Sequence, residues 1–249
     1  MLLSLSAFVW LPLALAVMAG FTPYRHITWG LLSLTLLSAF ATGHLSLLGG
    51  VSTGLGFVLA YFAVNSTAHW RTAAWVALLL WCLALFLHWL PGFSNLKVLD
   101  KVIAGPHSTP FSLYLNLDKP LVFFALLLAF PRLLGKTQTA KWGATLATLL
   151  PLFALLPVAV WLGALAYEWS LPEWWWIFAI NNLLFTCVAE EALFRGLIQQ
   201  KAQQQFGTIA GLGYGLVFHF TGRLWASVGV HFLFNFAHLL FFTYPMLAR

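Results

Sequence analysis

The apolar residues of this chain fall into long, nearly continuous runs that charged residues, prolines or glycine clusters separate. An α-helix needs about 20 mostly apolar residues to cross the hydrocarbon core of a bilayer, and most of the runs are close to that length. We predict an all-α fold, a polytopic transmembrane helical bundle of about eight to nine spans, because one of the short second and third runs can be re-entrant. The spans are expected near residues 2–20, 27–43, 46–65, 72–90, 120–135, 142–167, 174–200, 206–221 and 224–246.

The longest segment between two predicted spans covers residues 91–119 and contains several prolines and glycines. Such residues are typical of turns, so we expect an outer loop that packs as a lid or lies on the membrane interface. The loop divides the chain in two. Residues 1–118 form an N-terminal transmembrane region of unknown role with this loop, and residues 119–249 form the transmembrane region that holds the candidate chemistry.

The composition supports a membrane setting. Hydrophobic residues make up 61% of the 249 residues and charged residues only 7%, against about 25% charged in soluble domains. This excludes a soluble enzyme, a disordered chain and a nucleic-acid binder. The formal charge of +6 reports the orientation of loops in a membrane protein rather than an anionic partner. The partner that the composition implies is therefore the lipid bilayer, with no nucleic acid.

The acidic residues inside predicted spans are few and adjacent. Of the six Asp and Glu, only Glu190 and Glu191 lie inside an apolar span, and Arg195 follows them. A charge at mid-bilayer costs about 2.5–3.5 kcal/mol on insertion scales, so such residues need partners or a water-filled cavity. Glu191 and Arg195 are four apart and can pair along one helix face. Glu190 points about 100° away and is then available to face a cavity.

Polar side chains also concentrate in the last two predicted spans. His219 is near the end of the eighth, and His231 and Asn235 lie one helical turn apart in the ninth. Together with Glu190, these residues supply a general base, imidazoles and an amide donor. Such a set can activate a water molecule and stabilise an oxyanion.

Three further polar residues of these spans are expected to have structural roles. His238 continues the stripe of the ninth span and is expected to pack or to support its neighbours. Asn181 and Asn182 precede the acidic pair and are expected to serve in polar packing or in lining a cavity, since polar side chains often join transmembrane helices.

Three short motifs resemble those of the CPBP family, the CAAX-protease and bacteriocin-processing membrane proteins that include the type II CAAX prenyl endopeptidases. The segment Glu190–Gly196 resembles the family's E-E-x-x-x-R motif, and His231–Asn235 resembles its H-x-x-x-N motif. His219 stands where the family has F-x-x-x-H, but Gly215 replaces the phenylalanine. The resemblance is confined to the last spans, less than half of the chain.

This resemblance implies an intramembrane endopeptidase that hydrolyses a peptide bond of a membrane-embedded or lipid-modified substrate. Glu190 and His219 would activate the attacking water, and His231 and Asn235 would line the oxyanion site. A peptide or protein substrate in the membrane is then the expected partner. The expected location is the inner (plasma) membrane of a prokaryotic cell.

The resemblance also implies that Glu191 and Arg195 organise the helix that carries the catalytic acid. It favours a glutamic protease without a cofactor. A metalloprotease with zinc held by Glu190, His219 and His231 stays open, because no compact zinc motif such as H-E-x-x-H is present to decide between the two.

Two other classes of protein stay open. A non-catalytic membrane scaffold or bacteriocin-immunity type protein would keep the buried polar residues for structure or peptide binding. A proton-coupled transporter would use Glu190 and His219 as a relay. The transporter is less favoured, because the chain has no internal repeat and no acidic residue in the spans of its first half.

Overall fold

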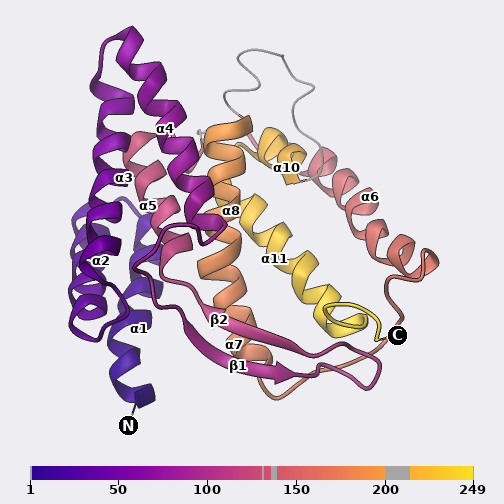
Figure 1. Cartoon of the computed structure of the whole chain (residues 1–249). Helices are drawn as coiled ribbons and strands as arrows, with labels where there is room; N and C mark the ends of the chain where they lie inside the picture. The colour runs from indigo at the N-terminus through magenta and orange to yellow at the C-terminus, as the bar shows by residue number, and fades with distance from the viewer. Residues whose placement is uncertain (1, 131, 136–138, 200–213, 249) are drawn as a thin grey trace. The chain divides into compact units, whose positions relative to one another are not determined.

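The computed structural model describes residues 2–130, 132–135, 139–199 and 214–248, and most of these are helical (Figure 1). The chain forms two compact units, each assembled from separate stretches of sequence. Unit 1 contains Met1–Leu96, Leu115–Leu134 and Leu184–Ile198, and unit 2 contains Lys97–Tyr114, Gly135–Leu183 and Gln199–Arg249.

Unit 1 is helical, and its first helices follow the predicted apolar runs. Their bounds are α1 (Leu2–Gly20), α2 (Arg25–Ala41), α3 (Leu47–Asn65), α4 (Ala68–Phe86) and α5 (Asp118–Ala129). Helix α1 packs on α2, and α3 packs on α4. The contact between α3 and α4 depends on a glycine, because a Cβ at Gly56 of α3 would lie 2.2 Å from Cζ2 of Trp81 in α4.

Helix α5 forms the core of unit 1. It contacts α1, α3, α4 and α8 (Val188–Glu191), and ten of its twelve residues are buried. With twelve residues it is about 18 Å long at 1.5 Å per residue, shorter than the roughly 30 Å of a bilayer core. Helix α5 therefore ends before the predicted span 120–135 does, and its apolar surface is buried against protein.

Unit 2 combines helices with a two-stranded sheet. Its helices include α6 (Trp142–Trp161), α7 (Trp175–Ile180), α10 (Tyr214–Thr221) and α11 (Leu224–Phe241). Helix α10 packs on α6 and on α11. Two small buried clusters lie among the described residues of the unit: one contains Ala104, Phe178 and Leu239, the other Leu156, Leu165 and Phe242.

The purely α-helical fold was predicted wrongly for the segment 91–119, which we expected to be an irregular loop. It contains strands β1 (Leu96–Val102) and β2 (Phe111–Leu115), which pair with each other (Figure 1). The connection between them is too short for a parallel crossover, so the two strands form an antiparallel hairpin.

Among the residues that the structure describes, five helices are long and apolar enough to cross a membrane, which supports a membrane protein. They are Leu47–Asn65, His69–Phe86, Trp142–Trp161, Trp175–Arg195 and Leu224–Phe241. The count of eight to nine spans stays a prediction. Residues 206–213 of the predicted eighth span lie outside the described residues, and only Tyr214–Thr221 of that span is described as helix.

The apolar helix that carries the acidic pair changes its winding three times. Helix α7 continues into a π-helix, η1 (Asn181–Cys187), then into α8, then into a second π-helix, η2 (Ala192–Gln199). π-helical turns are rare and occur mostly as single turns, frequently at functional sites. Both glutamates lie in the short α-helical stretch between the two π-helices.

Candidate functional site

The predicted ion pair of the acidic helix is confirmed. Nε of Arg195 donates to Oε2 of Glu191 at 2.9 Å, and their side chains are 11% and 1% exposed. The pair forms because residues four apart lie on the same face of a helix, with the acid placed first. A buried carboxylate costs several kcal/mol unless a cation and hydrogen bonds compensate it, so the contact with Arg195 compensates the burial of Glu191.

Glu190 has a different environment from its neighbour. Its side chain is half-buried, whereas Glu191 is buried. One residue corresponds to a rotation of about 100° around a helix, so the two carboxylates leave the backbone in different directions. This difference fits the predicted division between a structural and a reactive acid, while the reactive role stays a prediction.

Helix α11 holds His231 and Asn235 one turn apart, as predicted, and both are half-buried. Nδ2 of Asn235 donates to Oδ1 of Asn182 at 3.3 Å, which joins α11 to the first turn of η1 within unit 2. Asn182 itself is 8% exposed. The expectation that Asn182 contributes polar packing is therefore confirmed.

His238 packs at the end of α11. Its Nε2 lies 3.2 Å from the backbone oxygen of Thr243, and its ring meets that of Tyr244 edge-on with centroids 5.0 Å apart. These contacts fasten the segment that follows the helix. His238 therefore has the structural role that we expected.

His219 lies in the second turn of α10, and its side chain is exposed. Its ring contacts that of Phe220 with centroids 5.2 Å apart. Gly215, which replaces the phenylalanine of the family motif, is one turn earlier and is buried.

The predicted site residues are divided between the two units. Glu190, Glu191 and Arg195 belong to unit 1, and His219, His231 and Asn235 belong to unit 2. The structure brings Glu191 to Arg195 and Asn235 to Asn182. That the residues of both units act together in one catalytic site stays a prediction.

The structure does not test the metal alternative. Within the described ranges, no group of three His, Cys, Asp or Glu side chains is arranged to hold a metal ion. The proposed zinc ligands Glu190, His219 and His231 come from both units. Whether they bind zinc stays a prediction.

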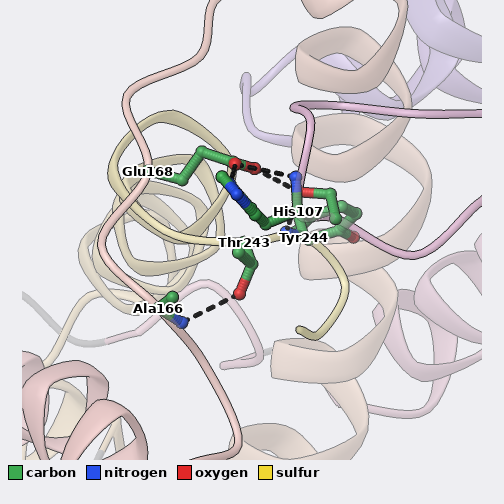
Figure 2. A network of polar contacts seen from close by, with 6 residues as sticks. His107, Ala166, Glu168, Thr243 and Tyr244 are labelled. Atoms are coloured by element: carbon green, nitrogen blue, oxygen red, sulfur yellow. Dashed lines mark hydrogen bonds and ion pairs between the residues drawn. The ribbon is translucent and has the colours of Figure 1, made fainter. Parts of the chain in front are cut away.

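A polar network in unit 2 was not anticipated from the sequence (Figure 2). Oε1 of Glu168 accepts from both the backbone N–H and Nδ1 of His107, each at 2.9 Å, and Oε2 accepts from the Ser108 hydroxyl at 2.7 Å. The same hydroxyl oxygen accepts from the backbone N–H of Tyr244 at 2.9 Å. One carboxylate thus ties the tip of the hairpin to the loop after α6 and to the segment after α11.

The carboxylate of Glu168 is an ion in this network. Burial works against its ionisation, but hydrogen bonds from Ser108 and from the backbone and ring of His107 outweigh burial and lower its pKa below the ordinary 4.5. Burial raises the pKa of the nearby Tyr244 to about 12, so its hydroxyl stays un-ionised even at moderately alkaline pH. A Cβ at Gly105 would lie 2.2 Å from Oε2 of this carboxylate, so a larger residue there would displace the Glu168 side chain.

A similar arrangement anchors the base of the hairpin in unit 1. Asp118, which is 2% exposed, accepts from Nδ1 of His88 and from Nδ2 of Asn95. The side-chain oxygen of Asn95 in turn accepts from the backbone N–H of Leu117 at 2.9 Å. The sequence alone shows these residues only as isolated polar positions in loops. Their contacts could not be predicted from it, because they join residues 22 to 30 positions apart.

Comparison of the chain with protein-family models, with curated proteins and with solved structures gives no match in any of the three.

Proposed function

We propose that this protein is an intramembrane endopeptidase of the glutamic type, which hydrolyses a peptide bond of a membrane-embedded or lipid-modified substrate. Its setting would be the inner membrane of a prokaryotic cell, with eight to nine spans. The proposal rests on the motif resemblance to the CPBP family and on the chemistry of the residues that carry it.

The observation that carries the proposal is the acidic helix. A buried Glu191–Arg195 pair at 2.9 Å lies in an apolar helix long enough to cross a membrane, beside the half-buried Glu190. Three ionisable residues in six positions of such a helix are expensive to keep, and intramembrane ionisable residues mark functional sites by default. The π-helical turns on both sides of the glutamates support a functional role for this stretch.

The reaction would begin with Glu190 taking a proton from a water molecule that His219 helps to hold. The water oxygen then attacks the carbonyl carbon of the scissile peptide bond, and the C=O π electrons move to the oxygen. His231 and Asn235 would donate hydrogen bonds to that oxyanion. The oxyanion electrons then reform the C=O bond, the C–N bond breaks, and the proton held by Glu190 passes to the leaving nitrogen, which gives an amine and a carboxylic acid that ionises afterwards.

In the metal alternative, Glu190, His219 and His231 would hold a zinc ion, which would polarise the carbonyl and lower the pKa of a bound water. In both the glutamic and the metal mechanism, the Glu191–Arg195 ion pair would stabilise the helix that carries Glu190.

The test compares protein termini by mass spectrometry in membranes of cells that carry wild type, Glu190→Gln or Glu173→Gln at matched expression. Glu173 is an exposed acid outside the five candidate spans, so it provides a control for the same substitution. We expect new termini with wild type and Glu173→Gln but not with Glu190→Gln. Identical termini in all three strains would overturn the proposal and favour a scaffold or immunity-type protein.

A further inference from the structure

Asn181 is a buried polar residue that lacks a hydrogen-bond partner for its side-chain oxygen. It is 3% exposed, and in the described part of the chain its Oδ1 accepts no hydrogen bond. Buried polar atoms in proteins nearly always have a partner. The requirement is stricter inside a membrane-spanning helix, where bulk water is not available to supply one.

The surroundings of Asn181 do not explain it as packing. Phe178, almost one turn earlier, lies in an apolar cluster with Leu239 of α11. The next residue, Asn182, hydrogen-bonds Asn235 of α11. These two contacts, one apolar and one polar, already hold this stretch against α11. Asn181 lies between them and is the first residue of the π-helix η1.

Other buried side-chain atoms without a partner differ in chemistry and place. In the described residues they are the hydroxyls of Thr28 and Ser52 and the indole N–H of Trp10, all in helices of unit 1. A hydroxyl can rotate to share a carbonyl of its own helix, whereas an amide oxygen can only accept, and N–H groups in the interior of a helix bond backbone carbonyls. Asn181, moreover, lies on the same apolar helix as Glu190, nine residues before it.

We propose that Asn181 binds the backbone of the substrate peptide, with its side-chain oxygen accepting a hydrogen bond from a substrate N–H group. This inference rests on the proposed function. A protease in the membrane must open the helix of its substrate to reach a peptide bond, and opening frees N–H and C=O groups that lipid does not satisfy. The side-chain amide of Asn has the same acceptor and donor groups as a peptide bond, so it can replace hydrogen bonds that the substrate backbone loses when its helix opens.

The test substitutes Asn181→Leu, which keeps similar size and removes the acceptor. The matched control is Thr28→Val, which also removes a buried polar atom without a partner but lies in α2. Cleavage is first measured in cells as the yield of the termini that depend on Glu190. It is then measured with purified protein in liposomes, on a synthetic peptide that spans the cleavage site these termini define, together with thermal unfolding of each variant.

We expect Asn181→Leu to lower kcat/KM about tenfold, mainly through a higher KM, because a lost hydrogen bond to the bound substrate weakens binding. Its unfolding temperature should equal or exceed that of wild type, because an uncompensated polar atom has been removed. Thr28→Val should cleave like wild type.

Two results would overturn the inference while leaving the protease intact. Asn181→Leu could cleave with wild-type kinetic constants, or it could unfold at a lower temperature with unchanged KM, which is the behaviour of a packing residue. Absence of any terminus that depends on Glu190 is a different result. It would overturn the proposed function and, with it, the substrate role of Asn181.

Discussion

Replacing Glu168 by Gln should lower the free energy of unfolding, because it weakens the polar network at the tip of the hairpin. The carboxylate accepts three hydrogen bonds, from the Ser108 hydroxyl and from the backbone and ring of His107. Hydrogen bonds to a charged group are worth about 1.5–3 kcal/mol and neutral ones about 0.5–1.5 kcal/mol, so each bond loses roughly 1 kcal/mol when the charge is removed.

The bond from the ring contributes little to this sum. The His107 side chain is 74% exposed, so solvent screens its interaction with Glu168. The bonds from the Ser108 hydroxyl and the His107 backbone therefore account for most of the effect. At roughly 1 kcal/mol each, they predict that Glu168→Gln lowers the free energy of unfolding by about 2 kcal/mol. A change of 1 kcal/mol shifts the unfolding temperature by roughly 2–4 °C in a chain of 150–250 residues, so the expected decrease is about 4–8 °C.

The effect should depend on pH with a known sign. The pKa of Glu168 in the folded protein is below the ordinary 4.5, so its contribution to stability is complete at neutral pH and is lost as the pH falls through the folded value. Thermal unfolding of detergent-purified protein, followed by tryptophan fluorescence, should show the full decrease at pH 7 and a smaller difference from wild type in acid, where the carboxylate becomes protonated. Glu173→Gln is the control. An equal decrease at pH 7 and in acid, or none at pH 7, would refute the ionised carboxylate as the source.

Three further predictions concern the helices. Arg195→Met should destabilise the protein by about 3–5 kcal/mol in denaturant or thermal unfolding, because it leaves a buried carboxylate without its cation; wild-type stability would contradict the buried pair. Asn235→Ala should lower turnover of the cleaved peptide roughly a hundredfold to a thousandfold, and unchanged turnover would remove Asn235 from the mechanism. Gly56→Ala should cost about 1–3 kcal/mol because its Cβ would lie 2.2 Å from Trp81, whereas Gly54→Ala, with nothing within 4 Å, should not destabilise; equal unfolding temperatures would contradict the close contact of α3 and α4.

The positions of the helices followed from the apolar runs, because the length of a run and its flanking polar residues are local signals. Predicted spans 2–20 and 46–65, for example, lie within one residue of α1 and α3 at either end. The local pattern does not tell whether an apolar helix faces lipid or protein. Helix α5 is short and buried on most of its surface, which depends on the four helices around it.

The hairpin was missed although the sequence held part of its signal. In β2, the residues Phe111, Leu113 and Leu115 alternate with Ser112 and Tyr114, the period of a strand with one buried face. Prolines and glycines on both sides of the pattern favoured a loop. Strand β1 gives a weaker alternation, so the pairing becomes evident only when both strands are considered together.

The candidate site could be predicted only as far as local spacing determines it. The Glu191–Arg195 pair follows from a separation of four residues on a helix. The contact between Glu168 and His107 joins residues 61 positions apart, and no local pattern encodes such a pair. The π-helical start at Asn181 was equally out of reach, because its winding depends on how the helix packs rather than on its composition.

The most direct test of the central proposal is hydrolysis by the purified protein in water labelled with oxygen-18. Wild type and Glu190→Gln are reconstituted in liposomes with a peptide that spans the site defined by the new termini, and the products are weighed by mass spectrometry. We predict that wild type releases an N-terminal fragment whose new carboxylate carries one heavy oxygen, and that Glu190→Gln releases none. Equal release by both proteins, or no release by either, would contradict an endopeptidase that uses Glu190 to activate water.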